Sequence, residues 1–227
     1  LTVTVPTNDT LCGGEIYNGA IFSGNINGIT YSWSNDNTSI GYAATGIGDI
    51  SPDTVINTGI SNQIATFTIT PTYIVSPTLT CSGAINSFKI VVKPQPNVFP
   101  VPNQSICAYD SFALVNFTGN IPNTLFNWSH NNVAIGLVSS GSGDISSFPS
   151  NYSGLTTQTA FIDVVPEFNG CFGDTMSFEL TVNPIPTVTQ PQSFIYCPNE
   201  STSIITFDGN LGSQSTYNWS LSLNTIG

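Results

Sequence analysis

The chain has 227 residues, of which only 7% are charged, and its 13 Asp and Glu against two Lys and Arg give a formal net charge of −11. An acidic chain of this kind lacks the basic surface that nucleic-acid binding requires, and it disfavours electrostatic attraction to anionic membranes. No apolar run approaches the roughly 20 residues that cross a bilayer, so this segment is not expected to insert directly into a membrane. No signal peptide is recognisable at the start, and any targeting sequence is expected to be cleaved or to lie outside this segment.

The first part of the chain predicts a series of short β-strands. Residues 3–12 and 16–22 form the first two, and residues 29–34 (ITYSWS) alternate between apolar and polar side chains in the manner of a half-buried strand. Residues 40–44 are expected to form a further strand, and the paired glycines in 46–49 predict a turn. Two strands rich in β-branched residues complete the set, at 64–70 and 88–92.

This pattern is repeated along the chain. Its markers recur 95 residues later, and a third copy begins 90 residues after the second, because the first copy carries five extra residues at 74–78. Repetition at a fixed period indicates a string of similar domains. The markers are the cysteines Cys12, Cys107 and Cys197 and the tryptophans Trp33, Trp128 and Trp219.

Two Pro-x-Pro segments, at 94–96 and 184–186, mark the ends of the repeats. We therefore predict domains at 1–96, 97–186 and 187–227, the third holding only the first strands of a repeat. A fragment of that size is too small to bury a core, so the chain is expected to belong to a longer protein or to have its third domain completed by something else.

The fold class predicted is all-β, with tandem Ig-like β-sandwich domains strung in a row, because seven or so short strands occur in about 90 residues and no helical period is present. Trp33, Trp128 and Trp219 are expected to be the central core residues of their domains.

The cysteines are expected to form structural disulfides in an oxidising compartment. Their repeated positions suggest the pairs Cys12–Cys81 and Cys107–Cys171, with Cys197 left unpaired in this segment. Free buried thiols are the alternative. Zinc is not expected, because no Cys-x-x-Cys or Cys/His cluster is present.

Catalysis is not predicted. The single histidine, His130, lies in a polar turn and has no counterpart in the other copies, so a solvated loop residue is the simplest interpretation. Hydrolysis by paired carboxylates is the alternative, but no acidic cluster stands apart from the repeat.

The acidic residues that recur are candidate ligands for a metal ion. Glu15 and Asp110 share one repeat position, and Asp49 and Asp144 share another, which makes these four the candidate calcium ligands. Calcium takes six to eight oxygen ligands, and one acidic side chain at each position provides few of them. The alternative is that each acid caps a turn. No other cofactor is expected.

Exposed aromatic residues would favour a carbohydrate-binding module, since sugars stack on them. Tyr42, Tyr109 and Tyr152 are the best candidates for exposure, but no spacing joins them in one site. A second alternative is a non-catalytic spacer of a secreted multidomain enzyme.

The repeat resembles a known family. Its motifs are Cys-x-x-Asp/Glu, aromatic-x-Trp-Ser, Gly-x-Gly-Asp-Ile and Gly-Cys-x-Gly-Asp, and together they are similar to the PKD-like, Ig-like repeats of giant cell-surface adhesins in Bacteroidota. That family includes SprB-type gliding-motility adhesins exported by type IX secretion. The resemblance implies a structural or adhesive segment of a long filament at the cell surface, attached to the outer membrane or secreted. The implied partners are other repeats of the same chain, a surface polysaccharide or another cell-surface protein.

A second resemblance concerns glycans. Asp-Ser/Thr followed by an aliphatic residue is similar to the O-glycosylation sequon of Bacteroidota. It makes Thr10, Thr54 and Thr175 the candidate acceptors, and chance matches in a Thr-rich chain are the alternative.

Overall fold

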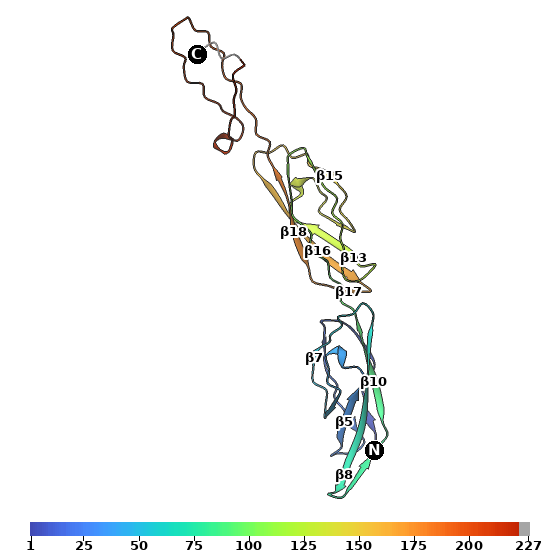
Figure 1. Ribbon diagram of the computed structural model, residues 1–227. Helices are drawn as coiled ribbons and strands as arrows, with labels where there is room; N and C mark the ends of the chain where they lie inside the picture. Colours follow the sequence, from blue (N-terminus) through green and yellow to red (C-terminus); the bar gives the residue numbers. More distant parts are fainter. Residues whose placement is uncertain (223–227) are drawn as a thin grey trace.

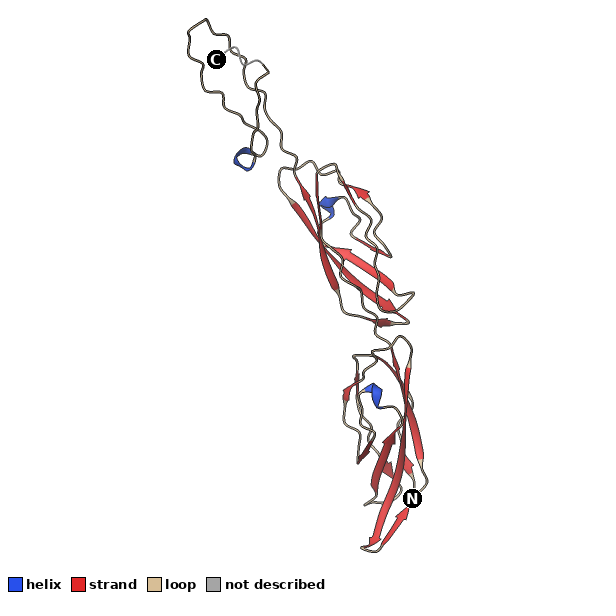
Figure 2. Cartoon of the chain, in the orientation of Figure 1, coloured by secondary structure: helices blue, strands red, loops and turns tan. Residues whose placement is uncertain are grey.

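A computed structural model describes residues 1–222 and shows two β-sandwich domains in a row, followed by an extended C-terminal segment (Figure 1). Strands and loops make up both domains, and the described residues contain no α-helix, only three short 3-10 turns (Figure 2). The predicted class, tandem Ig-like β-sandwich domains strung in a row, is confirmed.

The first domain contains ten strands and one 3-10 turn. They are β1 (Val3–Thr4), β2 (Asp9–Cys12), β3 (Ile16–Tyr17), β4 (Ser23–Gly24), β5 (Thr30–Asn35), η1 (Thr38–Ile40), β6 (Thr45–Ile47), β7 (Asp53–Thr54), β8 (Gln63–Ser76), β9 (Leu79–Ser82) and β10 (Asn86–Lys93).

The second domain repeats this order without strands equivalent to β1 and β4, and the C-terminal segment adds one 3-10 turn. The elements are β11 (Gln104–Cys107), β12 (Ser111–Phe112), β13 (Leu125–His130), η2 (Val133–Ile135), β14 (Ser140–Ser142), β15 (Phe148–Pro149), β16 (Gln158–Phe168), β17 (Cys171–Phe172), β18 (Met176–Asn183) and η3 (Gly212–Gln214).

Each domain is built on one large sheet. Its strand order is β2-β10-β8-β5-β6 in the first domain and β11-β18-β16-β13-β14 in the second, with β9 and β17 pairing to the ends of β8 and β16. The first strand of each sheet runs parallel to the last strand of its domain, and the other pairs are antiparallel. Very short strands and single bridges form the opposite layer.

The two domains have separate hydrophobic cores. Alternate residues of β8 point inward, and Ala65, Phe67 and Ile69 are fully buried. The rings of Phe67 and Phe88 stack with centroids 5.2 Å apart at the centre of the first core. Neither core cluster includes a residue of the other domain, so each sandwich has the means to fold by itself.

The three tryptophans differ in burial. Trp128 belongs to the second core, and Trp33 is half-buried, with its ring 5.8 Å from that of Phe67. Trp219 is 68% exposed, contrary to the expected core position, because no strand of a third sheet covers it in the described residues.

The glycines opposite Trp33 and Trp128 explain part of the repeat. Trp128 is the cross-strand partner of Gly141, and a Cβ at that glycine would overlap the indole ring. Trp33 and Gly46 form the same pair in the first domain. The first glycine of Gly-x-Gly-Asp therefore makes room for the tryptophan.

Residues 40–44 do not form the predicted strand. Asn37 accepts a backbone hydrogen bond from Ser39 and starts the 3-10 turn η1, and Gly41 ends it with a φ of 99°. That left-handed conformation favours glycine and is incompatible with a continuing strand.

The third copy has only the beginning of the fold. The isolated bridge between Thr189 and Asp208 corresponds to the β1–β4 pairing of the first domain. No strand forms after β18 in the described residues, whereas the first strands of a repeat were expected here. The Ile226-Gly227 end of the third copy lies outside the described residues.

Candidate functional site: the interdomain junction

A disulfide joins the two domains. Cys12 of the first domain bonds to Cys171 of the second, with their Cα atoms 5.6 Å apart. The predicted pairs Cys12–Cys81 and Cys107–Cys171 are wrong, because Cys81 and Cys107 are free and exposed. Cys197 is free and exposed as well, as expected for this segment.

Strand register explains why the two cysteines of one domain do not meet. Cys12 lies beside Lys93, at the end of the sheet where Val92 pairs with Gln63. Cys81 pairs with Tyr73, ten residues further along β8. At about 3.3 Å per residue, these positions are roughly 33 Å apart. A disulfide requires Cα atoms within about 7 Å, so the two cysteines of one sandwich cannot bond.

The hairpin of β16 and β17 carries Cys171 toward the first domain. Its two-residue turn is Asn169-Gly170, both with positive φ (51° and 80°), as expected for the common Asn-Gly hairpin turn. The Lys93 ammonium donates a hydrogen bond to the Asn169 carbonyl at 3.0 Å. This hairpin and the end of β10 are therefore in contact where the first domain ends.

An asparagine holds the linker between the domains. The Asn120 side chain accepts a hydrogen bond from the Asn97 backbone N–H at 2.8 Å and donates one to the Gln95 carbonyl at 3.3 Å. The preceding Gly119 faces the Asn97 carbonyl so closely that a Cβ would overlap it.

The same asparagine contact occurs at the start of the first domain, where Asn25 accepts from the Thr2 N–H at 3.1 Å, and after the second domain, where Asn210 accepts from the Thr187 N–H at 2.7 Å. Our sequence reasoning missed this clamp. The signal was available, since the dipeptide Gly-Asn recurs at 24–25, 119–120 and 209–210 with the offsets of the repeat.

The recurring acids act separately, and of these four only Glu15 caps a local turn. Glu15 accepts a hydrogen bond from the Cys12 N–H at 2.7 Å. Asp49 and Asp144 each accept one from a backbone N–H, of Phe22 and Phe117 respectively, at 2.8 Å. Asp110 follows the same turn as Glu15 but makes no side-chain hydrogen bond in the described chain. The four calcium candidates are not brought together, and residues 1–222 contain no group of three or more metal-binding side chains.

Both ring nitrogens of His130 contact backbone groups of the turn that follows it. Its Nδ1 accepts the Asn132 N–H at 3.3 Å, and its Nε2 lies 2.6 Å from the Val138 carbonyl, which makes Nε2 the protonated nitrogen. Asn35, at the same repeat position, makes the same two kinds of bond, accepting from the Asn37 N–H and donating to the Tyr42 carbonyl. His130 thus substitutes for an asparagine at a turn.

The three tyrosines considered for sugar binding are not brought together as one set, because only Tyr109 and Tyr152 line a common hollow, of about 160 Å³. Tyr42 is buried, Tyr109 is 62% exposed and Tyr152 is half-buried. Burial, followed by the charge of Asp53, raises the pKa of Tyr42. Tyr42 therefore belongs to the core and is not available to a ligand.

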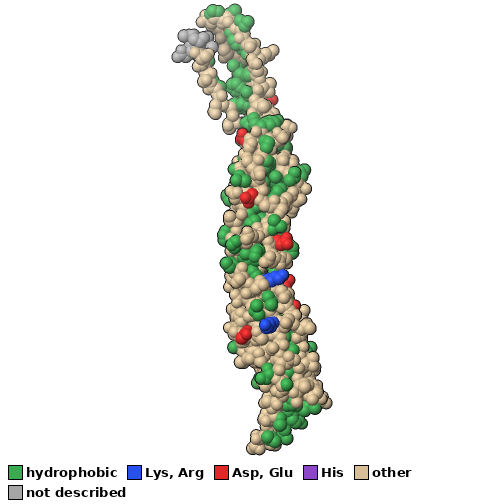
Figure 3. All heavy atoms as spheres, turned by 90° about the vertical axis from the view of Figure 1, so that its right-hand side faces the viewer, with side chains coloured by type: hydrophobic (Ala, Val, Ile, Leu, Met, Phe, Trp, Pro, Cys, Tyr) green, Lys and Arg blue, Asp and Glu red, His purple; other side chains and the backbone are tan. Residues whose placement is uncertain are grey.

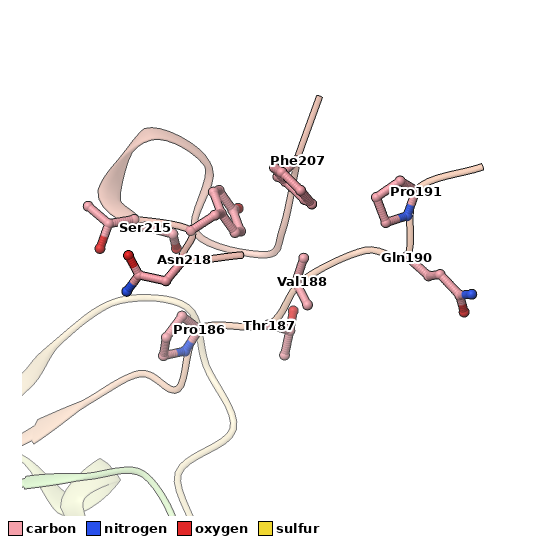
Figure 4. A pocket seen from close by; sticks show the side chains of 10 residues that line it. Pro186, Thr187, Val188, Gln190, Pro191, Phe207, Ser215 and Asn218 are labelled. Atoms are coloured by element: carbon pink, nitrogen blue, oxygen red, sulfur yellow. The ribbon is translucent and has the colours of Figure 1, made fainter. Parts of the chain in front are cut away.

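One hollow in the C-terminal segment corresponds to an uncovered core. It has a volume of about 500 Å³ and is lined by residues including Val188, Phe207 and Tyr217. Figure 4 shows Val188 and Phe207 facing this hollow from two segments of the chain. The Phe207 and Tyr217 rings stack 6.1 Å apart, as Phe117 and Phe126 pair at 5.8 Å in the second domain.

The candidate glycan acceptors Thr10, Thr54 and Thr175 are all exposed. The Asp9 and Asp53 carboxylates each accept a hydrogen bond from the N–H of the threonine that follows, at 2.8 and 2.7 Å. Two of the three sequons therefore share one local geometry.

These features define a class of protein: tandem Ig-like β-sandwich domains, an architecture that many cell-surface domains share. Residues 5–96 match the family profile of the PKD-like domain. The disulfide is typical of a secreted or extracellular protein. No helix within residues 1–222 is long and apolar enough to cross a membrane. No curated protein sequence matches the chain.

Several solved structures resemble the chain. Fibronectin(III)-like modules of Clostridium thermocellum CbhA are 12% identical, with a TM-score of 0.30, over 81% of this chain and 95% of theirs. Mouse cadherin-23 EC22-24 is 15% identical, with a TM-score of 0.34, over 81% of this chain and 64% of its own. The Ig1-2 module of the Drosophila receptor protein tyrosine phosphatase DLAR is 12% identical, with a TM-score of 0.27, over 80% of this chain and 98% of its own.

Proposed function

We propose that this chain is a structural and adhesive repeat segment of a long extracellular filament, in which it acts as a spacer at the cell surface. The observation that carries the proposal is the Cys12–Cys171 bridge, which connects two domains and crosses neither core. A bond at this place fixes one domain against the next, which a spacer needs.

The molecular surface supports the same role. Figure 3 shows an elongated molecule whose surface is largely uncharged, with few charged side chains on this face. A net charge of −11 with only two basic residues gives neighbouring filaments the same sign and disfavours lateral association. The partners proposed are other repeats of the same chain, and a polysaccharide or protein of the surface to which the filament attaches.

The proposal extends to glycosylation and gliding. Thr10, Thr54 and Thr175 are exposed and are proposed to carry O-linked glycans. By the resemblance of its repeat, the full protein is proposed to be a gliding or surface-attachment adhesin exported by type IX secretion. We propose no enzyme activity for this segment.

The test uses cells that make the protein. Antibodies raised against residues 1–186 should label intact, unpermeabilised cells and mark extended filaments in electron micrographs. Mass spectrometry of the native protein should find hexose-bearing peptides at the three threonines. Labelling only after permeabilisation would overturn the proposed location, and unmodified threonines would overturn the glycosylation.

A further inference from the structure

The free thiols occupy the same repeat positions as the bonded ones. Cys107 corresponds to Cys12 at the offset of 95, and Cys81 corresponds to Cys171 at the offset of 90. Cys81 and Cys107 are both exposed, whereas the bonded pair lies at the contact between two domains.

The setting of Cys107 matches that of Cys12. Cys12 lies opposite Lys93 and Cys107 lies opposite Asn183, each at the last residue of its domain's final strand. The residue after each cysteine donates its N–H to that same strand end, at 2.9 Å from Gly13 to Lys93 and at 2.7 Å from Ala108 to Asn183. Cys107 is therefore placed at the C-terminal end of the second domain as Cys12 is at that of the first.

The setting of Cys81 likewise matches that of Cys171. Cys81 pairs with Tyr73 and Cys171 pairs with Phe168, which are equivalent residues of β8 and β16. The extra residues of the first copy lie beyond this pair, at the tip of the hairpin, so they do not move Cys81 along the sheet.

The chain that enters each domain passes its hairpin in the same way. Two residues after each of these cysteines, Gly83 faces Leu1 and Gly173 faces Pro96, and a Cβ at either glycine would overlap the residue it faces. Leu1 and Pro96 are equivalent at the offset of 95. The start of the first domain thus has the geometry of the start of the second, where a preceding domain is bonded.

We infer that the Cys12–Cys171 bridge is one unit of a disulfide ladder, in which the first cysteine of each domain bonds to the second cysteine of the next. Cys107 takes the hairpin cysteine of a following domain of this repeat, and Cys81 takes the strand-end cysteine of a preceding one. The exposed apolar tip of the β8–β9 hairpin, Ile74, Val75 and Leu79, is then covered by that preceding domain (Figure 3, lower end).

The chemistry is ordinary thiol–disulfide exchange. One thiolate attacks an oxidant disulfide such as oxidised glutathione and forms a mixed disulfide, and the second thiolate then displaces the glutathione thiol. In balance, the two cysteine thiols lose two protons and two electrons, and the oxidant becomes two thiols. The inference rests on the proposed function in one respect, namely that the extracellular location supplies an oxidising environment.

The test joins residues 1–186 directly to residues 2–227 in one chain. The Pro186–Thr2 junction has the register of the natural Pro96–Asn97 junction, because Thr2 and Asn97 are equivalent. After refolding in a glutathione redox buffer, peptide mapping should find Cys107 of the first copy bonded to Cys81 of the second. The free thiols should number three, as in the single chain, whereas an absent ladder leaves five.

Two matched variants locate the bond. Cys81→Ser in the second copy should free one thiol on Cys107 of the first copy, and Cys81→Ser in the first copy should leave the ladder bond intact. The Cys12–Cys171 peptides of both copies report folding in the same digest. Those two bridges without a Cys107–Cys81 bridge would overturn the inference.

A second measurement does not depend on the joined chain. Residues 1–186 contain both complete cores and can be oxidised at high concentration. The ladder predicts head-to-tail multimers linked from Cys81 to Cys107, and symmetric Cys81–Cys81 dimers would contradict it. Failure of either experiment leaves cell-surface labelling unaffected, so the ladder and the proposed function fail separately.

Discussion

Cys12 and Cys171 are 159 positions apart in sequence and 5.6 Å apart between their Cα atoms. Their bond crosses the boundary between two sandwiches whose cores share no residue. It therefore restricts how the domains move against each other more than how either one folds.

Replacing both bonded cysteines by serine should loosen the junction. In a Cys197→Ser background, fluorophores on Cys81 and Cys107 lie at the far ends of the two domains and report the distance between them. We expect single-molecule energy transfer to show a distinctly broader distance distribution without the bridge, since only the linker, its asparagine clamp and the Lys93–Asn169 hydrogen bond remain. The bridged Cys197→Ser chain is the control, and equal widths would mean that the linker alone sets the geometry.

Gly141→Ala should destabilise the second domain. The added methyl group would overlap the Trp128 ring, and forcing extra volume into a packed site costs about 1–3 kcal/mol. Denaturant unfolding measures the effect, with Ser140→Ala on the same strand as the exposed control. If the two variants unfold at the same denaturant concentration, the ring does not depend on this glycine.

Asp144→Ala should destabilise the second domain by about 1–3 kcal/mol, because it leaves the partly buried Phe117 N–H without its acceptor. Asp144→Asn keeps an acceptor and should cost less. Thermal unfolding of the parent chain should be the same with calcium or with a chelator. A calcium-dependent rise in Tm that disappears in Asp144→Asn would instead show that this acid binds the ion.

His130→Asn should change the free energy of unfolding by less than about 0.5 kcal/mol, since asparagine at the equivalent position 35 makes the same turn bonds. His130→Ala loses both hydrogen bonds and should cost about 1–2 kcal/mol. Calorimetry of the two variants separates these outcomes. Equal destabilisation by both would refute the structural equivalence of His130 and Asn35.

Tyr17 should make stability fall at high pH. Burial, followed by the charge of Asp9 and the neighbouring Tyr42, raises the pKa of Tyr17 from 10.0 to about 12. The folded state therefore holds this proton more tightly than the unfolded state does. The stabilisation is complete below pH 10 and is lost as the pH rises toward 12, by an expected 1–2 kcal/mol or so.

Tyr17→Phe is the control for that pH dependence. The Tyr17 hydroxyl is buried and makes no hydrogen bond to any described residue. Its removal should leave stability at pH 7 equal or slightly higher, and should flatten the decline above pH 10 in urea unfolding curves. If the loss of stability above pH 10 is the same in Tyr17→Phe, other titrating groups such as Tyr42 cause it.

The sequence predicted the class of fold because strand periodicity and repeat spacing are local signals. Burial follows the alternation expected for 64–70 and 88–92, now parts of β8 and β10. The predicted disulfide pairing is wrong because it depends on which end of the sheet each cysteine reaches. Cys12 lies beside Lys93 at one end of the sheet, and Cys81 pairs with Tyr73 toward the other, and no local sequence pattern records that register.

Other differences have equally specific causes. The Gly-Asn dipeptide recurs at the repeat offsets in the sequence, but only the hydrogen bonds of the structure show that its asparagine holds the chain where each domain begins. Trp219 is exposed because burial of the equivalent Trp128 depends on strands β14 and β16 beside it, which have no counterpart in the described third copy.

The parallel pairing of β2 with β10 has a mechanical consequence. In each domain the first strand of the large sheet and the last strand lie side by side and point the same way, so tension on the chain ends would pull them past each other if no bridge were present. The four register pairs from Asp9–Ile90 to Cys12–Lys93 would then carry load together in shear. Because the bridge begins at Cys12, the last residue of β2, a pull between the start of the chain and the second domain can pass along β2 and through the disulfide. The core of the first domain is thereby shielded from that pull.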